Sequence, residues 1–459
     1  MSTIDVIEAP ATQAAKAVRN PYLEGNFAPV RVETTAFDLP VTGSVPQELE
    51  GRLLRIGPNP IGADPASYHW FTGAGMAHGV RLAGGKAQWY RNRFVLGDDV
   101  AAKLGKPPIG GPRNGFGDGG ANTNIIDMGG RTYAVVEAGS LPVELTYELE
   151  SVARSNLEGT LDHGFTAHPK VDAVSGELHA MTYQPGLQAL QYLVVDKAGR
   201  SRTVALIDAP HCPMIHDIAI TQAFAVVLDL PVDFAPALIG KGFPFAWNPD
   251  RAGRIGLLPR NGDLAAMRWI ETPSCYVFHV MNAYDEPETG SVVIDVIRHP
   301  KVFATDMQGP SEGDPVLARW WIDLARGVLS ETILDERGQE FPRFNDAHGS
   351  LPYRYGYTAE TGALRTFGAT FKHDLQTGRS ESHDHGPGRA TLEPVFVARD
   401  GAKSEDDGWV LSYVYDANRD ASDVVILDAQ AFTDDPVATI RLPARVPFGF
   451  HGNWLPDPR

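Results

Sequence analysis

The sequence predicts an all-β protein, and three features support this fold class. Short segments rich in Val, Ile, Leu, Tyr and Phe are cut at close intervals by Gly, Asp, Asn and Pro, which is typical of a sandwich, barrel or propeller. The 47 glycines and 35 prolines supply the turns. A degenerate hairpin unit also recurs, and recurrence at about 40 to 60 residues favours the blades of a propeller.

In several copies of this hairpin unit an apolar strand ends in Asp, a short turn contains Gly and a second strand follows. The copies are HPKVDAVSGELHAM (168–181), VVDKAGRSRTVAL (194–206), YTAETGALRTFG (357–368), KHDLQTGRSESH (372–383) and VILDAQAFTDDPVATIRL (425–442). They are too imperfect to count blades. A closed ring would nevertheless bring strands that are distant in sequence to one axis.

The chain is expected to begin with a weakly helical N-terminal arm over residues 1–20, followed by a single β-propeller domain over 21–459. A length of 459 residues also fits two or three ordinary domains, so length does not decide. Polar inserts at 103–122 and 301–340 are predicted to form a cap of loops and short helices over one face. Within the second insert, the periodicity of 318–334 fits either a helix or a strand.

Composition indicates a globular protein that does not bind nucleic acid. Hydrophobic residues make up 43% and charged residues 21%, and the net charge of -17 offers no basic face for phosphates. The two cysteines, Cys212 and Cys275, lie far apart and are expected to be buried free thiols. The N-terminus lacks a signal-peptide pattern and no apolar run reaches about 18 residues, which predicts a cytoplasmic protein.

One segment qualifies that expectation. Residues 231–249, PVDFAPALIGKGFPFAWNP, are apolar, aromatic and interrupted by Pro and Gly, so they cannot form a long helix or a regular strand. A packed loop is one interpretation. The other is an exposed apolar patch at the mouth of a substrate cavity or at a membrane surface, giving peripheral membrane contact.

Four histidines stand where a polar side chain is unexpected. His168, His216, His279 and His451 each interrupt a short apolar or turn-forming stretch. Any one of them alone is more readily a core residue satisfied by a backbone carbonyl. Imidazole is the commonest metal ligand, however, and the four together suggest one metal gathered from across the fold. The other ten histidines lie mostly in polar, turn-rich segments, as His299 does, and are expected to be structural.

Four nitrogen ligands would leave up to two open positions on an octahedral metal. Oxygen chemistry requires such positions, whereas a structural zinc site is closed. Iron(II) fits best on these grounds, and zinc remains conceivable from ligand type alone.

Three glutamates are placed in apolar contexts where an unpaired charge would be costly: Glu137, Glu340 and Glu393. Each is expected to meet either the outer N–H of a metal-binding imidazole or an arginine. Arg343 and Arg399 are the arginine candidates.

The chain resembles the carotenoid cleavage oxygenases along nearly its whole length. The landmarks are NPYLEGNFAPV (20–30), GRLLRIGPNP (51–60), YHWFTGAGMAHGV (68–80), ANTNII (121–126), EAGSLPVEL (137–145), FTAHPK, MIHDIAIT, GRIGLLPR, EFPR, EPVFVAR and FGFHGNW.

This resemblance implies a seven-bladed propeller with a capped face and one non-haem iron(II) per chain. The implied iron ligands are the four histidines already singled out, and the implied carboxylates behind them are the three glutamates. Thr123 is the implied residue whose side chain crowds one open iron position. The implied reaction is oxidative scission of a C=C bond, with dioxygen as co-substrate and two carbonyl products.

The expected substrate is an apolar alkene of the carotenoid or apocarotenoid class. Relatives that cleave stilbenes or alkenyl phenols resemble one another in a lysine before the glutamate, which helps bind the phenolate. Here that residue is Val136, which cannot hydrogen-bond a phenol. We expect Val136 and Phe71 to contact the substrate. The alternative is a stilbene or alkenyl phenol of the isoeugenol, 4-vinylguaiacol or resveratrol type.

Two other classes of function are open to such a sequence. A propeller can bind pigments or partners without turning them over, because a fold does not fix a function. The same ligands on zinc or manganese could also support hydrolysis, but the sequence offers no converging general base.

Overall fold

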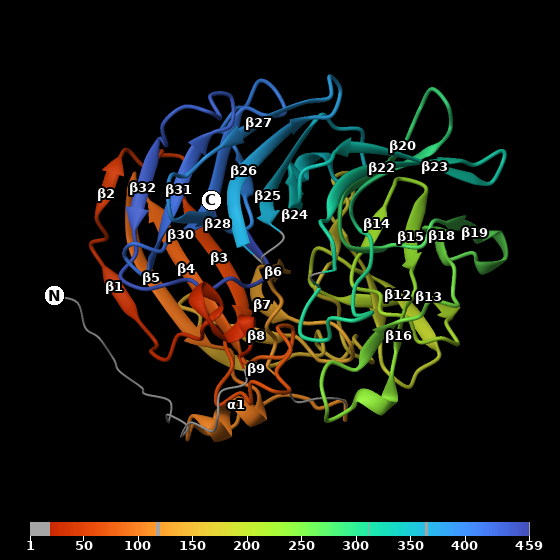
Figure 1. Ribbon diagram of the computed structural model, residues 1–459, viewed down its shortest axis with the longest axis horizontal. Coiled ribbons are helices and arrows are strands. Elements are labelled where there is room, and N and C mark those ends of the chain that lie inside the picture. The colour runs from red at the N-terminus through yellow and green to blue at the C-terminus, as the bar shows by residue number, and fades with distance from the viewer. Residues whose placement is uncertain (1–18, 116–119, 311, 363–365, 459) are drawn as a thin grey trace.

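The computed structural model describes residues 19–115, 120–310, 312–362 and 366–458. Most of the N-terminal arm predicted for residues 1–20 lies outside them. Within the described residues, seven antiparallel sheets of four to six strands form the blades of a propeller (Figure 1). The predicted fold class is therefore confirmed, and the structure supplies the number of blades that the repeats could not.

The first five blades follow one another along the chain. The first blade contains β6 (Asn124–Met128), β7 (Arg131–Val135), β8 (Val143–Leu145) and β9 (Ser151–Arg154), and the second contains β10 (Lys170–Val171), β11 (Leu178–Tyr183), β12 (Ala189–Val195) and β13 (Ser201–Asp208). The third contains β14 (Ile218–Ile220), β15 (Phe224–Asp229), β18 (Gly253–Pro259) and β19 (Arg268–Thr272), and the fourth contains β20 (Tyr276–Asp285), β21 (Val292–His299), β22 (Val316–Asp323) and β23 (Val328–Asp335). The fifth contains β24 (Gln339–Phe344), β25 (Tyr355–Gly362), β26 (Thr366–Asp374) and β27 (Arg379–His383).

The last two blades combine both ends of the chain. One contains β28 (Arg389–Thr391), β29 (Val395–Ala398), β30 (Gly408–Asp416), β31 (Ala421–Asp428) and β32 (Ala438–Arg441), with β2 (Val41–Gly43) on β32. The other contains β33 (Gly452–Pro456), β3 (Gly51–Pro58), β4 (Gly75–Ala83), β5 (Lys86–Phe94) and β1 (Thr35–Phe37). In Figure 1 the red N-terminal strands accordingly lie beside the blue C-terminal ones, and these two pairings close the ring.

The innermost strands surround the axis. Contacts join β10 to β14, β14 to β20, β20 to β24, β24 to β29, β29 to β33 and β33 to β6. Strands in the middle of a blade, such as β12 with the sequence ALQYLVV, are mostly apolar and almost wholly buried because neighbouring blades cover both faces. All five predicted hairpin units form antiparallel pairs of strands in the structure.

Loops and short helices cover one face of the ring. The helices of the described residues are η1 (Pro21–Leu23), η2 (Gly25–Phe27), α1 (Asp98–Lys103), η3 (Pro236–Leu238), η4 (Leu264–Ala266) and η5 (Asp346–His348), and they do not all belong to this face, because η5 ends two residues before Ser350 on the opposite face. The expectation that residues 301–340 belong to the cap is wrong for most of that insert. Residues 316–335 form β22 and β23, because Trp320 packs as a fully buried blade residue.

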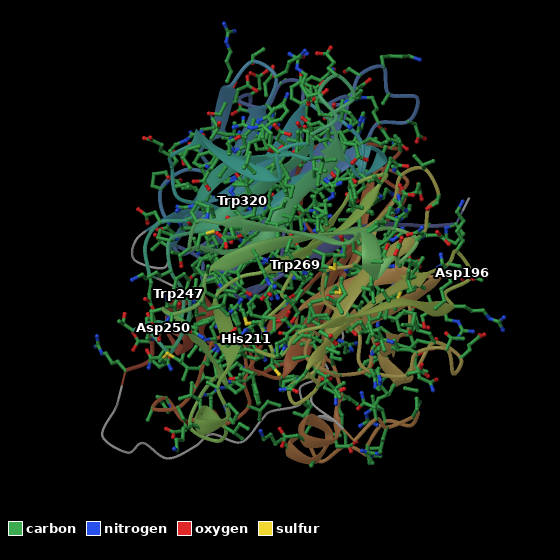
Figure 2. The ribbon with its side chains drawn as sticks, turned by 90° about the vertical axis from the view of Figure 1, so that its right-hand side faces the viewer. Asp196, His211, Trp247, Asp250, Trp269 and Trp320 are labelled. Carbon is green, nitrogen blue, oxygen red and sulfur yellow. The ribbon has the colours of Figure 1, made fainter. Side chains whose placement is uncertain are left out.

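The apolar segment 231–249 folds as a hairpin of β16 (Val232–Phe234) and β17 (Phe245–Trp247) with η3 at its tip. Figure 2 shows Trp247 and Asp250 near the edge of the molecule, apart from Trp320. Phe243 and Phe245 are buried, whereas the Ile239 side chain is 61% exposed. The segment therefore combines both interpretations, a packed base and an exposed apolar tip. Among the described residues, no helix is long and apolar enough to cross a membrane.

Asp172 connects three blades on the face opposite the cap. It follows β10 and accepts hydrogen bonds from Arg260 (2.9 Å) and Gln222 (2.7 Å) of the next blade, and from Ser350 (2.8 Å) before β25. Burial raises the pKa of Asp172, but the hydrogen bonds from Arg260, Ser175, Gln222 and Ser350 outweigh it and hold that pKa well below its usual range.

We predict that Asp172→Asn lowers the free energy of unfolding by about 3 kcal/mol near neutral pH, because it leaves a buried guanidinium without its carboxylate. The pKa of Asp172 is lower in the folded chain than the ordinary value of about 3.9 in the unfolded chain. Its contribution is therefore present above about pH 4 and is lost as the pH falls further. Urea unfolding followed by tryptophan fluorescence measures the difference. If the difference in unfolding free energy between the wild type and Asp172→Asn does not become smaller below about pH 4, the stabilising role of ionised Asp172 would be contradicted.

Candidate metal centre

Each of the seven innermost strands brings one polar residue to the same end of the axis. Three histidines stand just before β10, β14 and β33, the fourth lies within β20, and the remaining positions are taken by a threonine and two glutamates before β6, within β24 and before β29. In ring order the seven are Thr123, His168, His216, His279, Glu340, Glu393 and His451. The predicted ligands, scattered over nearly 300 residues, thus converge because every blade starts at the axis.

The four predicted histidines form one buried cluster, in which their ligand nitrogens all lie within 4.8 Å of one another. The Nε2 atoms of His168 and His216 are 3.1 Å apart, and so are those of His279 and His451. None of the four residues is more than 8% exposed, from the 8% of His279 to the 4% of His451. The cluster therefore presents a closed set of nitrogen donors inside the ring.

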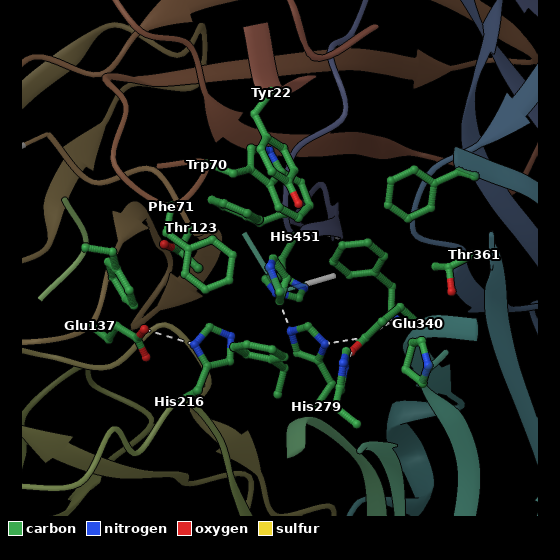
Figure 3. Close-up of a pocket in the computed structure, with 18 of the residues that line it drawn as sticks. Tyr22, Trp70, Phe71, Thr123, Glu137, His216, His279, Glu340, Thr361 and His451 are labelled. Carbon is green, nitrogen blue, oxygen red and sulfur yellow. Dashed lines mark hydrogen bonds and ion pairs between the residues drawn. The ribbon is translucent and has the colours of Figure 1, made fainter. Parts of the chain in front are cut away.

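Three of these histidines are held from behind by the three predicted glutamates (Figure 3). Nδ1 of His216 lies 2.9 Å from Glu137, Nδ1 of His279 lies 2.5 Å from Glu340, and Nδ1 of His451 lies 2.9 Å from Glu393. Glu137 comes from the loop after β7, and the other two belong to the ring itself. These contacts match the carboxylate–histidine pairs that orient metal ligands in proteins.

The protonation states follow from the carboxylates. Burial raises the pKa of Glu340 and of Glu393, but the adjacent histidines, with Arg343 in the case of Glu393, outweigh it and lower both pKa values. Both groups are ionised near neutral pH and can only accept hydrogen bonds. Nδ1–H of His279 and of His451 therefore donates to its carboxylate, and a neutral ring in this tautomer has its lone pair on Nε2.

Two lone pairs facing one another at 3.1 Å repel, and a cation between them removes the repulsion. Nitrogens bound to one ion at about 2.1 Å and at a right angle are about 3 Å apart, which matches the two close pairs. Burial also lowers the pKa of His451 to about 4 and that of His168 well below its ordinary value, so both rings are neutral near pH 7. The residues present therefore fit a divalent metal.

The alternative of an arginine partner holds for one glutamate only. Arg343 lies 3.5 Å from Glu393 in addition to His451. Arg399, the other candidate, instead pairs with Asp407 and Asp428.

His299 is a residue of this site that the sequence reasoning missed. It ends β21, is 3% exposed, and its Nε2 lies 2.7 Å from the second oxygen of Glu340. The flanking Arg298 and Pro300 made the position look polar and turn-like. The signal that could have found it is the mostly apolar run VVIDVI, which ends two residues before it and indicates a buried strand that the histidine terminates.

A cavity of about 350 Å³ lies on the capped side of the cluster. Its walls are largely aromatic, and the residues predicted to contact substrate, Phe71 and Val136, both line it, as does Thr123. Phe71 packs edge-on against Phe278 at 5.6 Å between ring centroids. In Figure 3 Glu137 and Thr361 lie on opposite sides of the histidine cluster, so a long ligand would pass the cluster along its length.

The Thr123 side chain lies at the wall of this cavity in Figure 3, and its hydroxyl donates to Asn122 at 2.8 Å. Its role in crowding an open metal position stays a prediction.

A second cavity, of about 290 Å³, extends along the axis on the other side of the cluster. Its walls are more polar than those of the first cavity and include Lys170, Asp217, Asn282 and Arg343. His279 and His451 line both cavities, so the cluster separates an apolar chamber from a more polar one.

Comparison with known sequences identifies relatives over nearly the whole chain. The family model described as retinal pigment epithelial membrane protein matches residues 27–456. A carotenoid cleavage oxygenase of Mycobacterium tuberculosis is 41% identical over 97% of this chain and 99% of its own. A carotenoid 9,10(9',10')-cleavage dioxygenase 1 of Arabidopsis thaliana is 33% identical over 95% of this chain and 90% of its own.

Solved structures give the same fold. The lignostilbene dioxygenase of Pseudomonas brassicacearum superposes with a TM-score of 0.86 at 26% identity, over 97% of this chain and 100% of that one. The cobalt-substituted apocarotenoid oxygenase of Synechocystis superposes with a TM-score of 0.83 at 29% identity, over 94% of this chain and 97% of that one.

We predict that His279→Ala lowers the metal retained after purification from about one ion per chain to a small fraction, because it removes one of four ligands and one of the two imidazole partners of Glu340. Elemental analysis of the purified protein measures the loss. His373→Ala is the matched control, since His373 is 3% exposed but contacts Thr358, away from the cluster. Equal metal content in both variants would contradict the assignment of His279 as a ligand.

Proposed function

The chain belongs to the carotenoid cleavage oxygenase family, and we propose that it is an iron(II)-dependent dioxygenase that cleaves a C=C bond of a carotenoid or apocarotenoid into two carbonyl products. The observation that carries this proposal is the four-histidine cluster, backed by three carboxylates, in the wall of an aromatic cavity. Iron(II) is favoured over zinc because four imidazole nitrogens leave positions open for oxygen chemistry.

The bound iron would supply the redox chemistry by which both atoms of dioxygen are added across the double bond. The protein's own part is to bind and orient the alkene. The aromatic walls exclude water and offer apolar contact over a length that passes the cluster, so the position along the polyene that reaches the histidines decides where it is cut.

Among the described residues that line the cavity beside the cluster, Tyr183, Glu137 and Glu340 are poorly suited to act as the general base of an alternative hydrolytic reaction. Tyr183 lines it near Glu137, but burial and the nearby carboxylate raise the pKa of Tyr183 well above its ordinary value, so its hydroxyl keeps its proton. Glu137 and Glu340 are each committed to a histidine Nδ1. Because these carboxylates already accept hydrogen bonds from histidines, the site supports oxygen chemistry over metal-assisted hydrolysis.

Val136 supports a polyene over a phenol as substrate. It lines the cavity directly before Glu137, where it gives an apolar contact and no hydrogen bond. Cleavage of a stilbene or alkenyl phenol is the second candidate, because a lignostilbene dioxygenase is among the similar structures.

The peripheral contact of residues 231–249 with a membrane is part of the proposal. The exposed Ile239 at the tip of the hairpin stands two residues before Lys241, and the base of the same hairpin lines the cavity through Phe243 and Phe245. An apolar tip beside a cation suits the interface of a bilayer, from which an insoluble polyene could pass to the cavity. A cytoplasmic location stays a prediction.

The decisive experiment is aerobic incubation of the iron-loaded protein with an apocarotenal, a carotenoid, resveratrol and isoeugenol, with products identified by mass spectrometry. We expect aldehyde or ketone pairs from the polyenes and little turnover of the phenols. Turnover of the phenols alone would move the chain to the second candidate. Absence of cleavage products from every compound would overturn the proposed reaction.

Val136→Lys provides a matched test of substrate choice in that experiment, with Val136→Leu as its apolar control. A lysine at the cavity wall buries a cationic amine beside the polyene, so we expect apocarotenal turnover to fall by about tenfold or more. Val136→Leu should retain most of it. An unchanged preference in Val136→Lys would show that this position does not select the substrate.

We predict that Ile239→Glu weakens binding of the protein to phosphatidylcholine vesicles, because it places a charge on the apolar tip. Sedimentation with vesicles measures the bound fraction. Leu264→Glu is the control, since Leu264 is a 48% exposed apolar residue of η4 outside the hairpin. Equal binding by wild type and Ile239→Glu would overturn the membrane contact.

A further inference from the structure

Three of the four histidine ligands are linked to one another through their neighbours in sequence. Lys170, two residues after His168, donates from Nζ to Oδ2 of Asp217 at 2.8 Å, and Asp217 directly follows His216. Lys170 also donates to the carbonyl of Val280 at 3.3 Å, and Val280 directly follows His279. The backbone N–H of Val280 donates in turn to Oδ2 of Asp217 at 2.8 Å.

These contacts cross from β10 to β14 to β20, which belong to three different blades. No sheet hydrogen bond joins these three strands within the described residues, so their relative position depends on packing and on side-chain contacts. The Asp217 side chain is only 1% exposed, and its ion pair with Lys170 lies in the polar cavity rather than in the substrate cavity. Substrate binding therefore does not explain it.

We propose that Lys170 is a positioning residue that locks His168, His216 and His279 into the spacing a metal requires. The proposal rests on the metal centre proposed above. A charge-assisted pair with a buried carboxylate is short and directional, so it fixes the strand ends more tightly than apolar packing does. Ligands offset by a few tenths of an ångström would hold the ion less tightly and in an altered geometry.

The fourth histidine, His451, is held by a separate set of contacts, so Lys170 would position only the other three. Arg343 donates to the carbonyl of Gly452 at 2.8 Å and to Asn453 at 2.9 Å, directly after His451. Asn453 in turn donates to Asn124 at 3.0 Å, on the strand that follows Thr123. Lys170 and Arg343 thus serve opposite halves of the ring.

A buried lysine–aspartate pair could serve stability alone, and the chain contains a matched example. Lys372 donates to Asp406 at 2.8 Å and to the carbonyl of Ala429 at 2.6 Å, and its side chain is 8% exposed. This pair joins β26 to the segment before β30, and none of its described contacts involves a histidine ligand. Lys372→Met is therefore a control for the loss of a buried ion pair without an effect on the cluster.

The test compares Lys170→Met with Lys372→Met, each loaded with Co²⁺. Release of cobalt to an excess of chelator gives the dissociation rate, visible absorption reports ligand geometry, and urea unfolding reports stability. We expect both variants to lose stability, while only Lys170→Met releases cobalt about tenfold faster and shifts its absorption bands. Lys170→Arg keeps a cation near Asp217, so its rate of cobalt release should be close to the slow rate of the wild type.

Asp217→Asn is a second variant, needed if Lys170→Met does not fold. It removes the charge but keeps an oxygen for the Val280 amide, and it too should speed cobalt release. A release rate within twofold of wild type and an unchanged spectrum in the variant that folds would overturn the positioning role. An equal acceleration in Lys372→Met would also overturn it. If the wild type binds no cobalt, the proposed metal centre itself fails, and the positioning role fails with it.

Discussion

The structure depends on one electrostatic constraint. At the axis of the ring, Nε2 atoms of neighbouring histidines approach one another to about 3 Å, so that their lone pairs face each other. Glutamates fix the tautomers by accepting from Nδ1, and this turns the Nε2 lone pairs inward. A propeller suits such a site because each blade begins with a strand at the axis, so seven distant segments can each contribute one side chain. The residues of the site are therefore far apart in the sequence but close together in space.

The same arrangement separates two environments. Toward the cap the ring faces aromatic side chains that suit an apolar alkene, and along the axis it faces charged and amide side chains that interlock the strands. In a strand, residues two apart point to the same side, so the residue two positions past a ligand also faces the axis. Lys170 after His168 and Asn453 after His451 follow this rule. These two positions face the second cavity and do not line the substrate cavity.

Local features of the fold could be predicted from the sequence, and features set by distant partners could not. The hairpins form as expected because their turns are encoded by adjacent Gly and Asp residues, whereas the blade count needs ring closure through β2 and β33. Residues 318–334 were ambiguous because the outer strand β23 is mostly exposed and has a weak pattern. The four histidines and three glutamates were found because polarity in an apolar segment is locally visible. His299 was missed because its burial comes from neighbouring elements.

In the proposed centre, ring closure and metal binding would be coupled through His451. This residue stands directly before β33, which completes the blade of β1, β3, β4 and β5 by pairing with β3. Opening of that pair would withdraw one ligand and Gly452, whose N–H donates to Glu393. A metal that binds only the closed arrangement therefore stabilises closure by the free energy of its binding, and closure in turn organises the site. In the proposed centre, β33 would thus close the ring of blades while His451, directly before it, completes the set of four histidines.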